Sequence, residues 1–143
     1  MAYKSALDRT CEKHGCAKVC LDPKLHEFDE CFDYGIRFGD IDGSVERKGH
    51  ILWMEWKIHF NDETWQNDHK AQLLQAIAFT TNSPKQTFVF VEGDPIKMDV
   101  RRVCIIKNGE VSDWYYTSPG SYKKFLRQWF ERADGRTKAG EVA

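Results

Sequence analysis

The stretch HILWMEWKIH, at residues 50–59, constrains the fold more than any other part of the chain. Its aliphatic and aromatic side chains are typical of a strand in the middle of a sheet, but Glu55 and Lys57 interrupt them. Side chains two residues apart on a strand project from the same face, so this carboxylate and this ammonium lie together. Because a charge inside a sheet is costly without a partner, we expect the two residues to have a specific role.

A second strand is predicted immediately before this one. From residue 36 the sequence follows a two-residue period, and residues 47–49 then reverse the chain. The residues that share one face of this strand are Ile36, Phe38, Asp40 and Asp42. The two strands are expected to form an antiparallel hairpin, which brings the aspartates of the first strand beside Glu55 and Lys57 of the second.

The rest of the chain alternates helices and strands. Acidic and capping residues at 61–64 begin a helix with apolar side chains at helical spacing, and residues 82–84 end it. The apolar run at 87–93 is typical of a central strand, and Asn108-Gly109 predicts a β-hairpin. A helix is expected from Pro119 to Ala133.

This order predicts an α/β fold in which helices flank the faces of a mixed central sheet, followed by a C-terminal β-hairpin and helix. With 143 residues the chain suits a single domain, residues 1–143, with a core of its own. We expect an N-terminal helical segment at 1–34 with a turn at Pro23, a core with the charged strand at 36–92, and the hairpin plus helix at 100–134.

The net charge of −1 gives no overall attraction to nucleic acid, so such binding would require a local patch. Basic residues concentrate late in the chain, where Lys123 and Lys124 begin a cluster that is either a solvated helix face or a surface that follows phosphates. Arg101 and Arg102, at the start of a strand, are candidates for phosphate contacts or for neutral surface. The longest apolar run is too short to span a bilayer and the first residues are not signal-like, so we expect no membrane partner and a cytoplasmic location.

Cysteines gather near the N-terminus. Four of the five cysteines, together with two histidines, lie in the first 31 residues: Cys11, Cys16, Cys20, Cys31, His14 and His26. Thiolate and imidazole are the usual ligands of zinc, but the spacing is irregular and lacks paired C-x-x-C motifs. Both a zinc site and reduced cysteines therefore remain open, while Cys104 lies in an apolar run and is expected in the core.

Two neighbouring carboxylates repel each other unless a cation lies between them. Mg²⁺ or Mn²⁺ suits Asp42, Glu55 and the backbone carbonyl of Trp56, because these hard ions take oxygen ligands and complete their shell with water and phosphate. Such an ion activates a water for attack on a phosphodiester. Lys57 would then orient that water or offset the charge that develops on phosphorus.

Asp42 followed thirteen residues later by Glu55-Trp56-Lys57 resembles the D…E-x-K signature of the PD-(D/E)xK nuclease superfamily, and DIDGSVERKGHILWMEWK resembles small phage-encoded and VRR-NUC-like members. The resemblance covers about residues 36–92, which would be the catalytic core. It implies a restriction-endonuclease-like core in the order helix, three strands, helix, strand. The third strand would lie near residues 32–38.

The resemblance also implies residues around the metal. Gln72 matches a glutamine that relatives carry on the helix after the lysine, with Gln75 as the alternative. An upstream acidic residue would complete the site, and Glu27, Glu30 and Asp40 all remain candidates.

We therefore expect a Mg²⁺-dependent DNA endonuclease, rather than an exonuclease, that hydrolyses duplex or branched DNA. The phage-like resemblance implies a role in phage DNA processing or phage–host conflict, in the cytoplasm of a bacterial host, and a homodimer would suit cleavage of both strands. The alternative from a different class is a non-catalytic module, such as an inhibitor, that binds nucleic acid or protein on a nuclease fold. The intact set of Asp42, Glu55 and Lys57 counts against this alternative. A purely structural interpretation of the motif is a surface ion pair of Glu55 and Lys57 on an edge strand, with Asp42 in an ordinary turn before Gly43.

Overall fold

The structure is a computed structural model, and it describes residues 25–34 and 41–136 of the chain. Contacts divide the chain into two units, Met1–Phe38 and Gly39–Ala143. In the first unit, a 3₁₀ helix (η2) spans Leu25–Cys31, directly after the turn predicted at Pro23. Residues 32–34 form a bend and a turn, so the part of the expected third strand that is described is not a strand. The helix expected before Pro23 and residues 35–40 lie outside the described residues.

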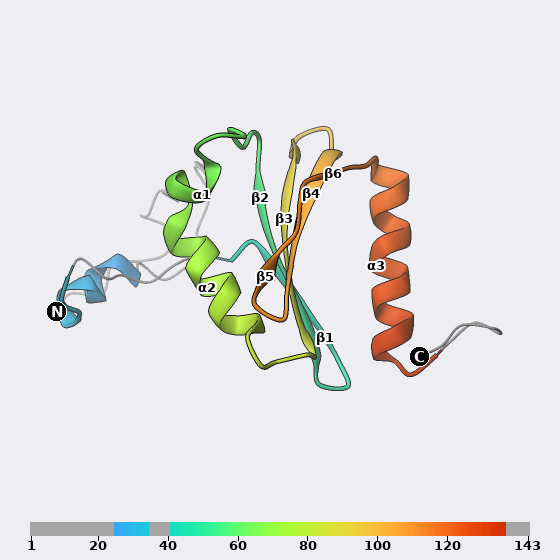
Figure 1. Cartoon of the computed structure of the whole chain (residues 1–143), viewed down its shortest axis with the longest axis horizontal. Coiled ribbons are helices and arrows are strands. Elements are labelled where there is room, and N and C mark those ends of the chain that lie inside the picture. Colours follow the sequence, from blue (N-terminus) through green and yellow to red (C-terminus); the bar gives the residue numbers. More distant parts are fainter. Residues whose placement is uncertain (1–24, 35–40, 137–143) are drawn as a thin grey trace, which may run out of the picture. The chain divides into compact units, whose positions relative to one another are not determined.

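A mixed six-stranded sheet forms the centre of the second unit, as the sequence predicts (Figure 1). Its strands run in the order β1-β2-β3-β4-β5, and β6 also pairs with β4. The central pair, β2 and β3, is parallel, whereas β1 with β2 and β3 with β4 are antiparallel. The strands are β1 (Gly43–Arg47), β2 (His50–Lys57), β3 (Gln86–Asp94), β4 (Asp99–Lys107), β5 (Glu110–Val111) and β6 (Tyr115–Tyr116).

Helices cover both faces of this sheet (Figure 1). Between β2 and β3 the chain forms α1 (Trp65–Asp68) and α2 (Lys70–Thr80), which pack on one face. The sequence predicted one continuous helix here, and the structure divides it at His69. On the other face lies α3 (Pro119–Ala133), with the predicted bounds. No helix within the described ranges is both long and apolar enough to cross a membrane.

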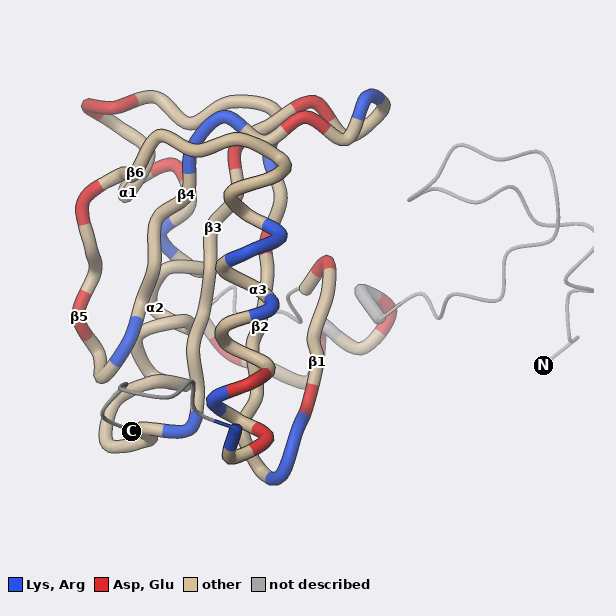
Figure 2. Tube along the Cα trace, turned by 90° about the vertical axis from the view of Figure 1, so that its right-hand side faces the viewer, with Lys and Arg blue, Asp and Glu red and all other residues tan. Residues whose placement is uncertain are grey.

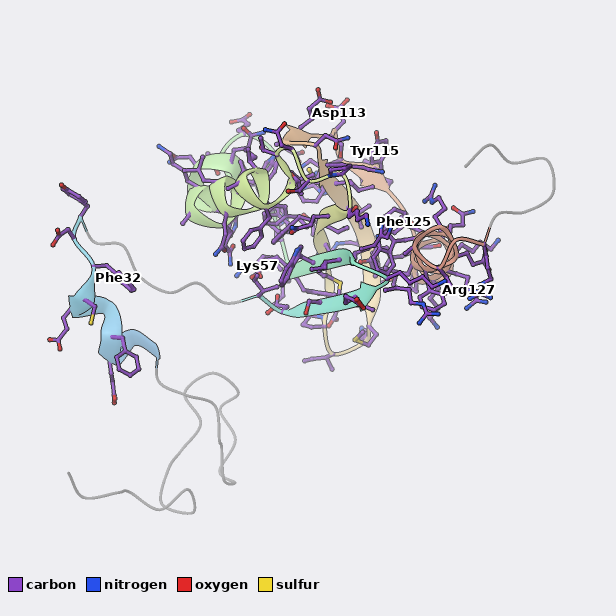
Figure 3. All side chains as sticks on the ribbon, turned by 90° about the horizontal axis from the view of Figure 1, so that it is seen from below. Phe32, Lys57, Asp113, Tyr115, Phe125 and Arg127 are labelled. Atoms are coloured by element: carbon purple, nitrogen blue, oxygen red, sulfur yellow. The ribbon has the colours of Figure 1, made fainter. Side chains whose placement is uncertain are left out.

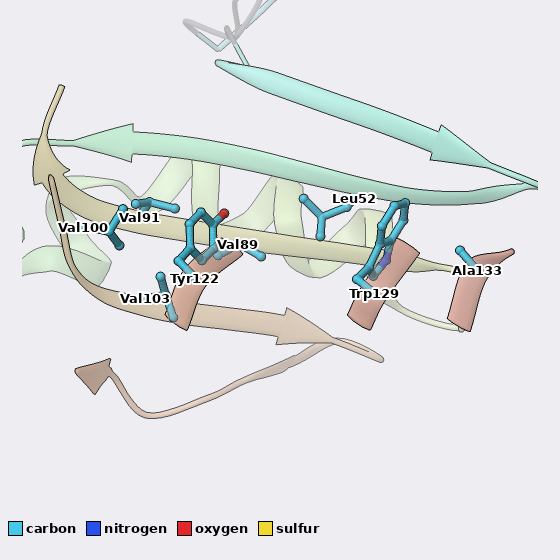
Figure 4. Close-up of a cluster of buried hydrophobic side chains, with 8 residues drawn as sticks. All are labelled: Leu52, Val89, Val91, Val100, Val103, Tyr122, Trp129 and Ala133. Atoms are coloured by element: carbon cyan, nitrogen blue, oxygen red, sulfur yellow. The ribbon is translucent and has the colours of Figure 1, made fainter. Parts of the chain in front are cut away.

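Two apolar layers hold the helices to the sheet. Toward α3 the buried residues are Leu52, Val89, Val91, Val100, Val103, Tyr122, Trp129 and Ala133 (Figure 4). Toward α1 and α2 they are Phe60, Trp65, Leu73, Ala76, Phe88, Phe90, Cys104 and Ile106. Alternate residues of β3 contribute to both layers, and this explains why its sequence is a continuous apolar run. The buried position of Cys104 confirms its expected place in the core.

Two tight turns fix the antiparallel pairs. Lys48 and Gly49 between β1 and β2 have φ of 49° and 82°, and Asn108 and Gly109 between β4 and β5 have φ of 53° and 77°. Positive φ at both central residues is what a type I′ hairpin requires. The hairpin predicted at Asn108-Gly109 is therefore present, although β5 is short. The sequence analysis did not predict β6, whose two tyrosines are exposed.

The close approach of β3 to β4 at Gly93 leads to a stability prediction. The register shifts between Glu92 and Gly93, and a Cβ placed on Gly93 would lie 1.8 Å from the backbone oxygen of Asp99. Gly93→Ala must therefore push the two strands apart, and we expect a loss of about 1–3 kcal/mol in the free energy of unfolding measured in urea. Gly120→Ala is the matched control, since nothing lies within 4 Å of that Cβ and alanine favours the helix. Equal stability of the two variants would contradict the close approach.

Candidate active site

Glu55 and Lys57 lie near the end of β2, on the face that α2 covers. Lys57 is labelled in Figure 3. Glu55 is only 2% exposed, whereas the Lys57 side chain is 37% exposed. In the parallel register Glu55 lies beside Phe90 of β3, within the apolar layer toward α1 and α2. The carboxylate is thus buried, and the ammonium marks where the site opens to solvent.

The two oxygens of Glu55 differ in their hydrogen bonds within the described part of the chain. The amide Nε2 of Gln72, on α2, donates to Glu55 Oε1 at 2.8 Å, and Lys57 Nζ lies 3.4 Å from the same oxygen. Glu55 Oε2 is buried and has no hydrogen-bond partner among the described residues. A buried carboxylate oxygen without a donor costs about 1–3 kcal/mol or more, so a missing cation or donor is the natural explanation.

Asp42 completes the group from the neighbouring strand. The register of β1 with β2 pairs Gly43 with Met54, and one further step places Asp42 opposite Glu55. Asp42 Oδ2 accepts a hydrogen bond of 2.7 Å from the backbone N–H of Trp56, which fixes the exposed carboxylate at the end of the strand. The structure therefore brings together Asp42, Glu55, Lys57 and Gln72, around the peptide unit that carries the Trp56 carbonyl.

Burial and the neighbouring charges change the pKa of Glu55. Burial raises the pKa of Glu55, the negative charge of Asp42 raises it further, and Lys57 and Gln72 partly offset both effects. Within the described ranges, no three His, Cys, Asp or Glu side chains are grouped so as to hold a metal ion. Two carboxylates are nevertheless the protein's usual share for Mg²⁺, which takes its remaining ligands from water and substrate. The arrangement fits that ion, because it would supply the partner that Glu55 Oε2 lacks.

A second buried carboxylate lies next to this group, and the sequence analysis missed it. Glu92 of β3 is the register neighbour of Lys57, and its Oε2 accepts from Phe60 N at 2.8 Å and from Arg102 Nη2 at 2.9 Å. Arg102 also pairs with Asp62. Burial alone would raise the pKa of Glu92, but these hydrogen bonds and the Arg102 charge outweigh it and hold the pKa below its usual value. A charge inside the apolar run TFVFVEG was the available signal, the same one that identified Glu55.

The two arginines proposed as substrate contacts differ in how far they are buried. Arg102 is 6% exposed and is also stacked on Trp114, with its guanidinium carbon 4.6 Å from the ring centroid, so it is committed to the protein interior. Arg101 is exposed, although it contacts Glu92 and donates to the carbonyl of Ile58. Of these two residues, only Arg101 is placed to reach a ligand.

The other predicted substrate contacts, Lys123 and Lys124, are exposed residues of α3, on the face of the sheet opposite to Glu55. The structure therefore does not bring them into the group around Glu55. Figure 3 shows the same separation for Lys57 and Arg127.

The N-terminal candidates lie in the first unit or outside the described residues. Cys31 is an exposed free cysteine, and Glu27 and Glu30 of η2 are exposed. The remaining zinc candidates, Cys11, Cys16, Cys20, His14 and the side chain of His26, and the acidic candidate Asp40, lie outside what is described. The zinc site and the choice of upstream acidic residue stay predictions.

The raised pKa of Glu55 predicts that its charge destabilises the folded protein. A carboxyl with a raised pKa favours folding most below its ordinary pKa of 4.5, and this advantage is lost as the pH rises through the folded-state value. We expect Glu55→Gln to be more stable than the wild type at pH 7 in EDTA, by about 0.5–2 kcal/mol in urea unfolding, with the difference vanishing below pH 4.5. The exposed Glu110→Gln is the control, and a Glu55→Gln variant less stable than the wild type at pH 7 would contradict the prediction.

The Glu92 cluster predicts the opposite behaviour. Arg102→Met leaves Glu92 as an unpaired buried charge, and we expect a loss of about 3–5 kcal/mol at pH 7. Because the pKa of Glu92 is lowered, its contribution is present above 4.5 and is lost as the pH falls through the folded-state value, so the deficit shrinks in acid. Urea unfolding at pH 7 and at a pH below 4.5 measures this change. The neighbouring Arg101→Met is the control, and we expect it to lose about 1 kcal/mol or less. Equal losses in the two variants would mean that the buried pair does not stabilise the fold.

Comparison of the chain with models of known protein families, with curated proteins and with solved structures found no match. The functional argument therefore rests on the geometry of the residues themselves.

Proposed function

We propose that this protein is a metal-dependent phosphodiesterase that hydrolyses DNA. The observation that carries the proposal is the buried Glu55 Oε2, which has no donor among the described residues although the other oxygen of the same carboxylate is held by Gln72 and Lys57. Asp42 lies opposite it and adds a second negative charge. Such a site suits a divalent cation better than it suits any neutral ligand.

The order of elements supports a restriction-endonuclease-like core. A hairpin of β1 and β2 carries Asp42 and the Glu55-Trp56-Lys57 motif, a helix follows with Gln72 facing Glu55, and β3 returns parallel to β2. This is the arrangement that the resemblance to the PD-(D/E)xK superfamily implies for the strand pair, the helix and the following strand. Only two strands precede the helix within the described residues.

Each side chain of the site would have a different role in phosphodiester hydrolysis. Asp42, Glu55 Oε2 and the carbonyl of Trp56 would hold Mg²⁺ or Mn²⁺, which supplies a Lewis acid and lowers the pKa of a bound water. Gln72 keeps the Glu55 carboxylate in one orientation, because its amide occupies Oε1 and leaves Oε2 for the ion.

Lys57 would act on the substrate. Its ammonium contacts Glu55 Oε1 and its side chain is partly exposed. It therefore has further N–H groups that can donate hydrogen bonds to a phosphate oxygen or to the attacking water. A cation beside the reacting phosphate offsets the negative charge that develops in the transition state.

Cleavage assays test this proposal directly. Supercoiled, linear and branched DNA are incubated with the protein in Mg²⁺, in Mn²⁺ and in EDTA. We expect cleavage only with a divalent metal and a decrease of about 10²-fold or more in both Glu55→Gln and Lys57→Met. The comparison of the three DNA forms identifies the substrate class.

Matched substitutions on other surfaces serve as controls. Glu110→Gln and Lys107→Met remove the same groups at exposed positions of the β4–β5 hairpin and should leave the rate unchanged. Cleavage that persists in Glu55→Gln would refute the site. A wild-type protein that binds DNA or a protein without cutting any DNA form would instead favour a non-catalytic module on this fold.

A further inference from the structure

The exposed part of α3 carries several positive charges. The helix buries Tyr122 and Trp129 against the sheet. Its exposed residues Lys123, Lys124 and Arg132 form no ion pair with any described residue, whereas Arg127 pairs with Glu131. These cations contribute little to the fold, so their role is to be sought outside it.

The positive surface continues into the turn between β1 and β2. Arg47 Nη2 lies 2.5 Å from Asp134 Oδ1, and Lys48 Nζ donates to the Asp134 carbonyl at 2.9 Å, which joins this turn to the end of α3. The guanidinium of Arg47 also lies 5.7 Å from the centroid of the Phe130 ring. Figure 2 shows the basic positions of the turn beside those of the helix.

The resulting cationic surface contrasts with the rest of the protein. Residues 46–48 and 119–136 contain seven lysines and arginines against three carboxylates, a net charge of +4 on a chain whose total is −1. The basic members are Arg47, Lys48, Lys123, Lys124, Arg127, Arg132 and Arg136. Exposed ion pairs within the surface, such as Arg127 with Glu131 at 2.9 Å, are weak enough for an external anion to compete.

The candidate active site has little net positive charge of its own to attract a polyanion. Asp42 and Glu55 lie there beside Lys57, and the nearby Arg101 and Arg102 already contact Glu92 and Asp62. Before a metal is bound, most of the attraction therefore has to come from elsewhere on the molecule.

Strand β1 connects the two regions. Among the described strands it forms one edge of the sheet, with Asp42 immediately before its first residue and Arg47 as its last. Five residues of extended chain span about 17 Å, which corresponds to about five base pairs of duplex DNA. A duplex that lies along this edge can contact the cationic surface at one end and the carboxylates at the other.

We propose that the cationic surface binds the phosphate backbone of duplex DNA, which then follows the β1 edge to reach Asp42 and Glu55. This inference rests on the proposed function for its destination, but the binding itself requires neither metal nor catalysis. The surface lies on the opposite side of the sheet from α2, so it acts as an anchor and does not contact the reacting phosphate (Figure 3).

Binding in EDTA tests the anchor separately from cleavage. The dissociation constant of a short labelled DNA duplex is measured by fluorescence anisotropy between about 50 and 200 mM NaCl. We expect Lys123→Gln/Lys124→Gln to bind about tenfold more weakly than the wild type, with a slope of log K against log salt reduced by about 2, since each lost phosphate contact removes about 0.9. Lys97→Gln/Lys107→Gln is the control, with the same change in charge at exposed positions away from α3, and should match the wild type.

The outcomes separate the two proposals. Equal affinity and equal salt dependence in the wild type and Lys123→Gln/Lys124→Gln would overturn the anchor, whether or not the protein cuts DNA. Retained binding with no cleavage in Mg²⁺ would overturn only the proposed function. Binding of polyglutamate is measured in parallel, because this polymer represents an acidic protein partner. If polyglutamate binds through Lys123 and Lys124 while the DNA duplex does not bind, the inference is wrong.

Discussion

The parallel pairing of β2 with β3 determines where the side chains of the candidate site lie. Parallel neighbours cannot be joined by a tight turn, and the chain between them crosses one face of the sheet as α1 and α2. This crossover places Gln72 above Glu55 and buries the carboxylate in an apolar layer. The register then makes Glu92 the neighbour of Lys57, so two buried acidic side chains meet at the carboxyl ends of adjacent strands.

These two carboxylates show how the same residue type is used in opposite ways. Both Glu92 oxygens have donors, and Arg102 neutralises the charge, so the pKa falls and the group stabilises the fold. Burial and the negative charge of Asp42 raise the pKa of Glu55, and its Oε2 has no donor among the described residues. A buried carboxylate with a perturbed pKa is a candidate for a functional site, and the proposed function rests on this difference between the two side chains.

Local rules account for much of what the sequence predicted. The reversal at residues 47–49, the Asn108-Gly109 turn and the start of α3 each depend on a few neighbouring residues, and the corresponding elements are present. The two-residue period was read at residues 36–42, of which 36–40 lie outside the described residues, and β1 begins at Gly43. Asp42, Glu55 and Lys57 were grouped correctly in space, because strand pairing follows from the same local pattern. The division of the helix at His69 and the short strand β6 were not predicted, since both depend on contacts with distant parts of the chain.

Arg101 and Arg102 show where sequence reasoning reaches its limit. The register of β3 and β4 shifts at these arginines and both of them contact Glu92, yet Arg102 is buried and Arg101 is exposed. Only the partner strand decides which one is buried, because Arg102 lies opposite Glu92 in the register. The charged residues of this protein therefore differ with the face of the sheet on which they lie: Glu92 and Arg102 are buried partners toward α2, whereas Lys123 and Lys124 of α3 are exposed and form no ion pair with a described residue. If a polyanion binds the cationic surface as proposed, β1 offers it a path to the carboxylates, because this strand ends at Arg47 and begins directly after Asp42.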